Sequence, residues 1–206
     1  MDSGIDLDSG RGITVQLTFD SAAPAQPEAP EVPAAPVFTD VQPGIWYADA
    51  VTWAVENGIT NGTTATTFSP DMTCSTAHII TFIWRALGSP EPASATPFAD
   101  VKADSYFAQS SAWAYEKGMV TGSAFEGDKP CTRAAAMEYF WKQAGSPAAA
   151  VTDKFTDVDA GASYAQAVAW AVENGLTNGT SDTTFSPDMT MTRGQIVTLL
   201  YRALVG

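Results

Sequence analysis

The sequence predicts an all-α fold built from three helix-loop-helix copies that pack together as one domain. A Phe-x-Asp-Val segment begins at 38, 98 and 155. Each Phe is followed fifteen residues later by a Trp, and each Trp five residues later by a Gly. Regular repetition of this kind indicates one structural unit used several times, and a unit of this size is too small to bury enough apolar surface alone.

The loop of each copy supports the same register. TTFSPDMT occurs at 66–73 and again at 183–190, whereas the middle copy has the shorter GSAFEGDKP at 122–130. The Phe-x-Asp-Val segments are 60 and 57 residues apart, and the shorter middle loop accounts for the difference. Insertions and deletions are tolerated best in loops. We therefore divide the repeats at 38–92, 93–149 and 150–206.

The first helix of each copy is predicted from apolar residues with helical spacing. In the first copy this face ends at Gly58, a residue type that suits a helix end. The middle copy has a more polar face, with Ser110 and Ser111. The face of the first copy consists of Tyr47, Ala50, Val51, Ala54 and Val55.

The second helix of each copy is predicted to begin after a Ser or Thr, which are preferred N-cap residues. These caps are Ser75, Thr132 and Thr192. In the third copy Gln195 follows Thr192 by three residues, which is the spacing of a capping box.

The segment before the repeats has a different composition. Residues 21–37 are mostly Pro, Ala and Glu, which is typical of an extended linker. Residues 1–20 include alternating apolar residues, which fit either the end strand of an upstream domain or an unstructured stub. We expect the chain to be part of a larger protein.

The net charge of -13 and the pI near 4.2 argue against nucleic-acid binding and against attraction to anionic lipid. No apolar stretch is long enough to insert into a membrane. The chain has one histidine, His78, without neighbours at metal-ligand spacing. Because no catalytic motif has its expected context, we expect no enzyme activity, no cofactor and no metal.

Two arginines stand at unfavourable positions. Arg85, Lys142 and Arg202 fall in last helical turns, where a cation suits the helix dipole. Arg133 and Arg193 instead follow the N-caps, where a cation is disfavoured, and the helix start is expected to offer unpaired N–H groups beside them. Either an external anion or an internal carboxylate could compensate. The internal candidates are Asp100, Asp128, Asp157 and Asp188.

Taken in order, these motifs resemble the S-layer homology family over 38–206. The family combines a Phe-x-Asp-Val start, a Trp-Ala helix ending in Gly, a Phe-x-Pro loop and a Thr-Arg-Ala-Glu motif. The resemblance implies a pseudo-threefold, three-pronged helical bundle. It also implies an extracellular module that anchors surface proteins to the bacterial cell wall by binding an acidic, often pyruvylated, secondary cell-wall polysaccharide in grooves between repeats.

The family's groove arginine corresponds to Arg133 in CTRAAA and to Arg193 in MTRGQI. The first copy has Thr76 at that position, and the motif's Glu is replaced by His78, Ala135 and Gln195. At most two arginine-lined grooves therefore remain. An alternative function is a protein-interaction or assembly module whose sugar grooves have degenerated.

Trp46 is the tryptophan expected to be exposed for sugar stacking, since it lies near a helix start, while the other five are expected to pack in the core. The candidate polysaccharide-binding residues are Arg133, Arg193, Thr132, Thr192, Thr76, Asp100, Asp157 and Trp46.

Cys74 and Cys131 occupy equivalent positions in the first two copies, where the third has Met191. Two interpretations fit: burial as small apolar side chains, or a disulfide, which requires nearby Cα atoms.

Overall fold

The computed structural model describes residues 38–151 and 153–205, and the described residues form six α-helices without a β-strand. The predicted all-α fold is confirmed. The interpretations of residues 1–37 lie outside the described residues. The helices are α1 (Ala48–Glu56), α2 (Thr76–Ala86), α3 (Ala108–Glu116), α4 (Arg133–Gln143), α5 (Ala165–Glu173) and α6 (Arg193–Leu204).

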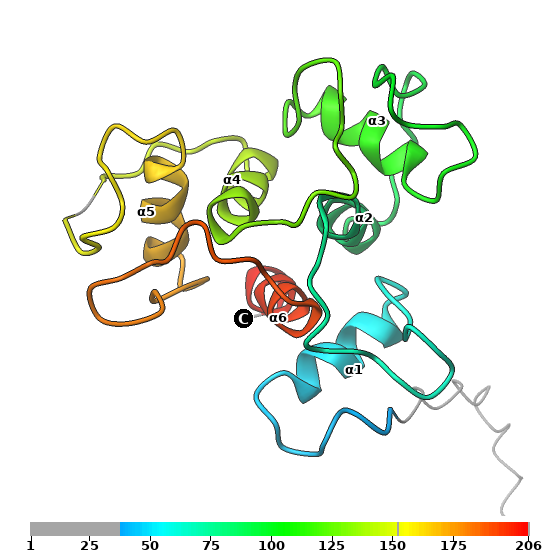
Figure 1. Ribbon diagram of the computed structural model, residues 1–206, viewed down its shortest axis with the longest axis horizontal. Coiled ribbons are helices and arrows are strands. Elements are labelled where there is room, and N and C mark those ends of the chain that lie inside the picture. Colours follow the sequence, from blue (N-terminus) through cyan, green and yellow to red (C-terminus); the bar gives the residue numbers. More distant parts are fainter. Residues whose placement is uncertain (1–37, 152, 206) are drawn as a thin grey trace, which may run out of the picture. The chain divides into compact units, whose positions relative to one another are not determined.

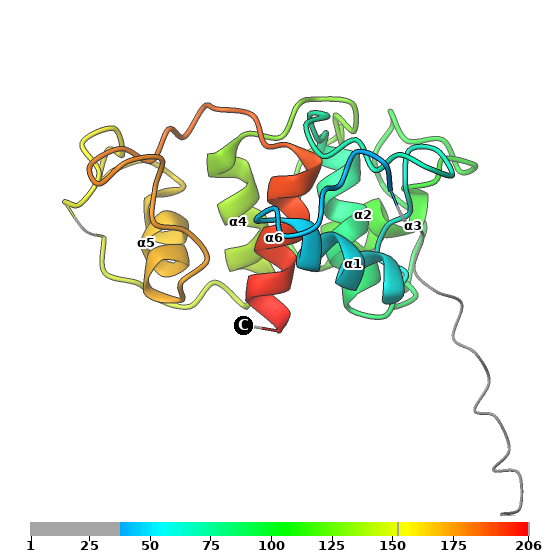
Figure 2. The same ribbon diagram turned by 90° about the horizontal axis from the view of Figure 1, so that it is seen from below.

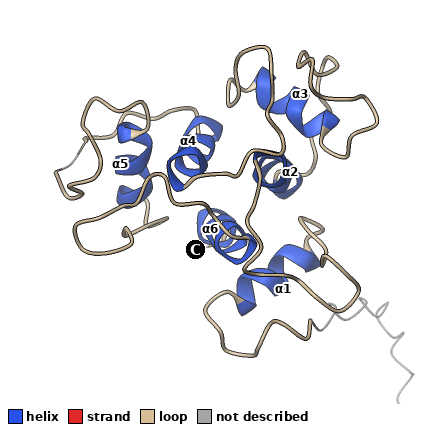
Figure 3. Cartoon of the chain, in the orientation of Figure 1, coloured by secondary structure: helices blue, strands red, loops and turns tan. Residues whose placement is uncertain are grey.

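Within the unit formed by the three copies, the second helices α2, α4 and α6 lie side by side around a common centre, and α1, α3 and α5 lie outside them (Figure 1, Figure 3). The turned view shows that α2, α4 and α6 run in similar directions (Figure 2). Each copy thus gives one helix to the centre and one to a prong.

Each outer helix packs on the central helix of another copy rather than on that of its own copy. Helix α3 packs on α2 of the preceding copy, and α5 packs on α4. Helix α1 of the first copy packs on α6 of the last. The three copies therefore form a closed ring.

A cycle of backbone hydrogen bonds joins the three copies just before their second helices begin. The N–H of Cys74 donates to the carbonyl of Met191 (2.8 Å), that of Met191 to Cys131 (2.9 Å), and that of Cys131 to Cys74 (2.8 Å). All three side chains are buried, and both thiols are free. The predicted burial of the two cysteines is confirmed, and the structure shows no disulfide between them.

The first two N–H groups of each second helix donate to loop carbonyls of another copy. In α4, Arg133 N–H donates to the carbonyl of Met189 (2.9 Å) and Ala134 N–H to that of Pro187 (3.0 Å). Helices α2 and α6 repeat this pattern with carbonyls of the second and first copies. The expectation that these helix starts offer unpaired N–H groups is therefore wrong.

The predicted N-caps Ser75, Thr132 and Thr192 are confirmed, and so is the capping box of Thr192 with Gln195. A second capping box, which the sequence did not predict, joins Ser75 and His78. In both, the third helical residue accepts a hydrogen bond from the cap's backbone N–H.

The polar face of α3 is matched by polar partners. The hydroxyl of Ser110 lies 2.9 Å from that of Thr81 in α2, and the hydroxyl of Ser111 donates to that of Thr96. Both serines are fully buried. Because each hydroxyl has a partner, the polar face of the middle copy can still be buried.

Each copy has one pair of phenylalanine rings in contact, with ring centroids 5.5–5.7 Å apart. The pairs are Phe38 with Phe68, Phe98 with Phe125, and Phe155 with Phe185. Each joins the start of a copy to its long loop. Among the helices of the described residues, none has the length and apolar character needed to cross a membrane.

Candidate functional site

Arg133 is held by neutral groups of the third copy. Its Nε donates to the carbonyl oxygen of Phe185 at 2.8 Å, and its Nη2 donates to the hydroxyl of Thr177 at 3.3 Å. The guanidinium also lies over the Phe185 ring, 4.8 Å from its centroid. Only 9% of the residue is exposed, and burial lowers its pKa, an effect that nearby Asp157 opposes.

Arg193 repeats this arrangement in the first copy. Its Nε donates to the carbonyl oxygen of Phe68 at 3.0 Å, and its Nη2 donates to the hydroxyl of Thr60 and the carbonyl of Asn61 at 3.2 and 2.9 Å. Its guanidinium lies 4.7 Å from the ring centroid of Phe68. The side chain is 4% exposed, and burial again lowers its pKa.

Neither arginine forms an ion pair. Within 38–151 and 153–205, the one ion pair joins Lys129 and Glu126 on the surface. The suggested internal carboxylate is thus not in direct contact with either arginine, and Asp157 acts on Arg133 only through its nearby charge. Backbone carbonyls and hydroxyls take that place, so each guanidinium keeps its charge without an acidic neighbour in contact.

A cavity of about 310 Å³ opens beside Arg133. Its wall combines the start of α4, one face of α6 and the loop that follows α5. No acidic residue is among the described residues that line this Arg133 cavity, in a chain with 23 acids. The lining residues are Trp46, Arg133, Leu176, Thr177, Asn178, Gly179, Met191, Gln195, Thr198, Leu199 and Arg202.

Trp46 reaches the Arg133 cavity from the first copy, just before α1. It is 61% exposed, so the predicted exposure of this tryptophan is confirmed. The indole packs edge-on against Tyr47, with ring centroids 4.9 Å apart, and Tyr47 is itself buried. A large aromatic surface is thus held at the edge of a cavity whose wall includes arginine side chains.

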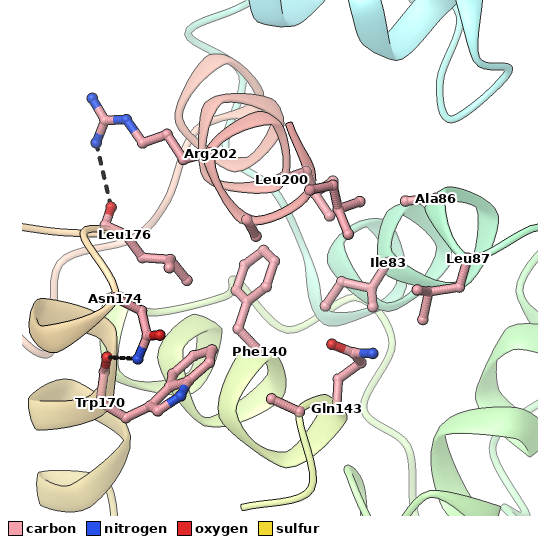
Figure 4. Close-up of a pocket in the computed structure, with 13 residues that line it drawn as sticks. Ile83, Ala86, Leu87, Phe140, Gln143, Trp170, Asn174, Leu176, Leu200 and Arg202 are labelled. Carbon is pink, nitrogen blue, oxygen red and sulfur yellow. Dashed lines mark hydrogen bonds between the residues drawn. The ribbon is translucent and has the colours of Figure 1, made fainter. Parts of the chain in front are cut away.

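Arg202 is a second cation of the Arg133 cavity, and sequence reasoning had explained it by the helix dipole alone. Its Nη1 donates to the carbonyl oxygen of Leu176 at 3.3 Å (Figure 4). Arg85 makes the equivalent bond to Ile59 in the first copy, at 3.3 Å. A basic residue occurs at this position in every copy, and this recurrence is the sequence signal that could have indicated a role for Arg202.

A different cavity, of about 210 Å³, lies at the C-terminal ends of the central helices (Figure 4). Ile83, Phe140 and Leu200 give it a largely apolar wall. Arg202 also borders it, but its guanidinium is directed away from these apolar side chains, toward the carbonyl of Leu176 (Figure 4). Arg202 is the one charged residue among the described residues that line this cavity, whereas Arg133 and Arg202 both line the Arg133 cavity.

Thr132 and Thr192 act as N-caps, and their hydroxyls accept the N–H groups of Ala135 and Gln195 at 3.2 and 3.4 Å. These contacts define the starts of α4 and α6 and so position Arg133 and Arg193. Neither threonine lines the Arg133 cavity.

Asp100 and Asp157 stabilise the long loops of the second and third copies by hydrogen bonds to loop N–H groups. The two carboxylate oxygens of Asp157 accept the N–H groups of Phe185 and Ser186 at 2.8 and 2.7 Å. Burial acts to raise the pKa of Asp157, but these hydrogen bonds, together with the Arg133 charge, outweigh it and hold the pKa below the ordinary value. Asp100 holds the middle loop in the same way, and its pKa is also lowered by its backbone hydrogen bonds.

In the first copy, Thr76 occupies the position that Arg133 and Arg193 occupy in the other two copies. Thr76 is 5% exposed and its hydroxyl donates to the carbonyl of Lys129. Burial raises the pKa of the Tyr139 hydroxyl to about 12. Ser163 takes the place that Trp46 has in the first copy. This third position therefore has neither the arginine nor the exposed aromatic ring.

Two segments of the chain, 37–75 and 154–197, match the family model described as the S-layer homology domain. No curated protein is similar enough to the chain to count as a match. The matched segments include Trp46, the loop that holds Arg193, and Arg193 itself. The match thus supports the S-layer homology family for the first and third copies, and S-layer homology domains are in general cell-wall anchoring modules.

Proposed function

We propose that the three copies form one S-layer homology unit, with the middle copy a divergent member, and that this unit anchors its parent protein to the bacterial cell wall. Its ligand is an acidic secondary cell-wall polysaccharide, bound at the Arg133 cavity. The unit acts outside the cell and catalyses no reaction.

One observation carries the proposal: two guanidinium groups border a cavity whose lining has no acid. Arg133 has neutral partners, so the cost of burying its charge is not offset by a carboxylate in contact. An external anion would provide that offset, and guanidinium groups suit carboxylates because they can donate two parallel hydrogen bonds. Trp46 supplies the flat apolar surface on which a sugar ring can stack.

The overall charge makes this local arrangement necessary. At -13, the chain as a whole repels a polyanion at long range. Buried charges are screened less than exposed ones, so Arg133 can attract an acidic group over a few ångströms, and the exposed Arg202 adds a second cation at the same cavity. Binding is therefore expected to depend on these two residues rather than on surface charge.

The test measures binding of the unit to protein-free cell-wall sacculi, and to a pyruvylated wall polysaccharide before and after mild acid has removed its pyruvate ketals. Trp46→Ala and Arg202→Met are the main variants, because Trp46 is exposed and Arg202 is exposed in the last turn of α6, so both should leave the fold intact. Each is expected to weaken binding to the pyruvylated polysaccharide about tenfold, since central aromatic and arginine contacts dominate interfaces.

Tyr115→Ala is the matched control, because Tyr115 is an exposed ring on α3 away from the Arg133 cavity. It should bind as the unchanged chain does. Failure of the unchanged chain to bind sacculi, or equal binding by all three variants, would contradict the proposal.

A second candidate function is a protein-interaction or assembly module. The observation that favours it is the Thr76 position, which has lost both the arginine and the exposed ring. Self-association or protein capture that persists without wall polysaccharide, together with no binding to sacculi, would support this candidate over anchoring.

A further inference from the structure

Three consecutive residues of the loop that follows α5 each accept a hydrogen bond from a basic side chain. The pairs are Leu176 with Arg202 (3.3 Å, Figure 4), Thr177 with Arg133 (3.3 Å) and Asn178 with Lys154 (3.2 Å). Leu176 and Asn178 accept through their carbonyl oxygens, and Thr177 accepts through its hydroxyl. The backbone of this loop is therefore held in place before a ligand binds, so a ligand-binding group on it loses less freedom on binding.

Asn178 presents its polar side chain at the Arg133 cavity. It lines this cavity beside Arg133 and Arg202, and it is exposed. Among the described residues, none exchanges a hydrogen bond with its side-chain amide or with its backbone N–H. Because Lys154 takes its carbonyl oxygen, the amide and the N–H are the groups of Asn178 that remain for a ligand.

The loop that follows the first helix of a copy has an asparagine at this position only where the loop binds an arginine. Asn178 belongs to the loop that binds Arg133, and Asn61 belongs to the loop that binds Arg193. The middle copy has Thr121 at the same position, and over the described residues its loop accepts no hydrogen bond from an arginine. The asparagine thus accompanies the arginine.

The turn itself does not account for the asparagine. A glycine with a positive φ follows this position in both the middle and the third copy, at 102° for Gly122 and 97° for Gly179. Thr121 therefore stands before the same kind of turn as Asn178. Asn178 itself is not in the left-handed region that favours asparagine, so a threonine can adopt its backbone conformation. A reason other than local conformation is required.

The chemistry of the amide supplies that reason. A carboxylate only accepts hydrogen bonds, and Arg133 and Arg202 already offer it cationic donors. A sugar hydroxyl both donates and accepts, and so does the side-chain amide of asparagine. The amide is therefore matched to a neutral part of the same ligand.

We infer that Asn178 is a specificity-determining residue of the Arg133 cavity: its amide binds a ring hydroxyl of the sugar whose acidic group the arginines bind, and so selects sugars with a hydroxyl at that place. This inference rests on the proposed function and adds a residue role to it.

Asn178→Thr in the full chain tests the inference, because the middle copy has a threonine before the same kind of turn. The shorter side chain, with one donor in place of two, should weaken binding to the pyruvylated polysaccharide about fivefold, since a neutral hydrogen bond is worth roughly twofold to tenfold in affinity. No charge is removed, so the loss should be equal at low and high salt, whereas the loss in Arg202→Met should shrink as salt is added. The melting temperature should be unchanged.

Thr121→Asn is the matched control, because it makes the reverse exchange in the loop of the middle copy, which does not serve the Arg133 cavity. It should bind as the unchanged chain does. Unchanged affinity in Asn178→Thr would overturn the inference. A lower melting temperature would also overturn it, by assigning the loss to the stability of the loop, and so would a loss that shrinks with salt as that of Arg202→Met does.

The variant Trp46→Ala separates this inference from the proposed function. If Trp46→Ala loses binding while Asn178→Thr retains it, the anchoring proposal stands and the role of Asn178 is wrong. If none of Trp46→Ala, Arg202→Met and Asn178→Thr changes binding of the pyruvylated polysaccharide, the Arg133 cavity is not the binding site and both proposals fail.

Discussion

The guanidinium of Arg133 contacts Phe185 in two ways: its Nε donates to the Phe185 carbonyl oxygen at 2.8 Å, and its Cζ lies 4.8 Å from the centroid of the Phe185 ring. Helix α4 of the second copy is thereby fixed to the long loop of the third. Arg133 consequently supports the fold as well as the cavity.

We therefore predict that Arg133→Lys destabilises the unit by about 1–3 kcal/mol, because Lys lacks both the Nε donor and the planar group that stacks on the ring. Urea unfolding followed by circular dichroism measures this change. Lys102→Arg, at an exposed loop position, is the control and should leave the unfolding midpoint unchanged. Equal midpoints for Arg133→Lys and the unchanged chain would contradict the prediction.

Asp157→Asn should destabilise the unit by about 1–3 kcal/mol at neutral pH, since the amide can accept only one of the two N–H groups and leaves the other unpaired. The folded pKa of Asp157 is below its unfolded value. Its contribution is thus complete above an unfolded pKa of about 3.9 and disappears as the pH falls through the folded value. Stability differences between the two chains should therefore shrink in acid.

Unfolding measured at pH 7 and near pH 3 checks this, with Asp182→Asn in the same loop as an exposed control. A difference between Asp157→Asn and the unchanged chain that stays constant over this pH range would show that the carboxylate does not titrate as described.

His78→Gln should make the unit less sensitive to mild acid. Burial, together with the Arg193 charge, lowers the folded pKa of His78, and Asp128 only partly opposes this. The unfolded chain then binds the proton more readily, so the unchanged protein loses stability as the pH falls through about 6.5. Gln keeps the capping acceptor without titrating. The stability of His78→Gln relative to the unchanged chain should rise from pH 8 to pH 5, and a constant difference would contradict this.

Neither cysteine should react in the folded protein. Burial raises the pKa of both Cys74 and Cys131 to about 12, so little thiolate exists at pH 8. A thiol reagent should therefore modify no cysteine in the folded chain and both after denaturation without reductant. Fewer than two reactive thiols in the denatured chain would indicate that they had been joined by oxidation.

Local features of the fold were predictable from sequence because neighbouring residues determine them. The caps at Ser75, Thr132 and Thr192 and the capping box of Gln195 followed from residue type and spacing. The box formed by His78 was missed because a histidine is not among the residues expected to close it.

Features that depend on contacts between copies were not predictable. The pairing of α1 with α6 joins residues at opposite ends of the repeats, and periodicity within one copy contains no information about it. The neutral partners of Arg133 and Arg193 are carbonyls, which every residue carries, so the sequence pointed to acids instead. The exposure of Trp46 was predicted, but its place in the wall of the same cavity as Arg202 required the structure.

The ring of copies also fixes their number. Each second helix begins against the loop of the next copy, and α6 begins against the loop of the first, so every such junction is already filled. A fourth copy would find no free junction, and the loss of one copy would leave two junctions open at once. Gene duplications or deletions that preserve this architecture should therefore add or remove whole sets of three, never single copies.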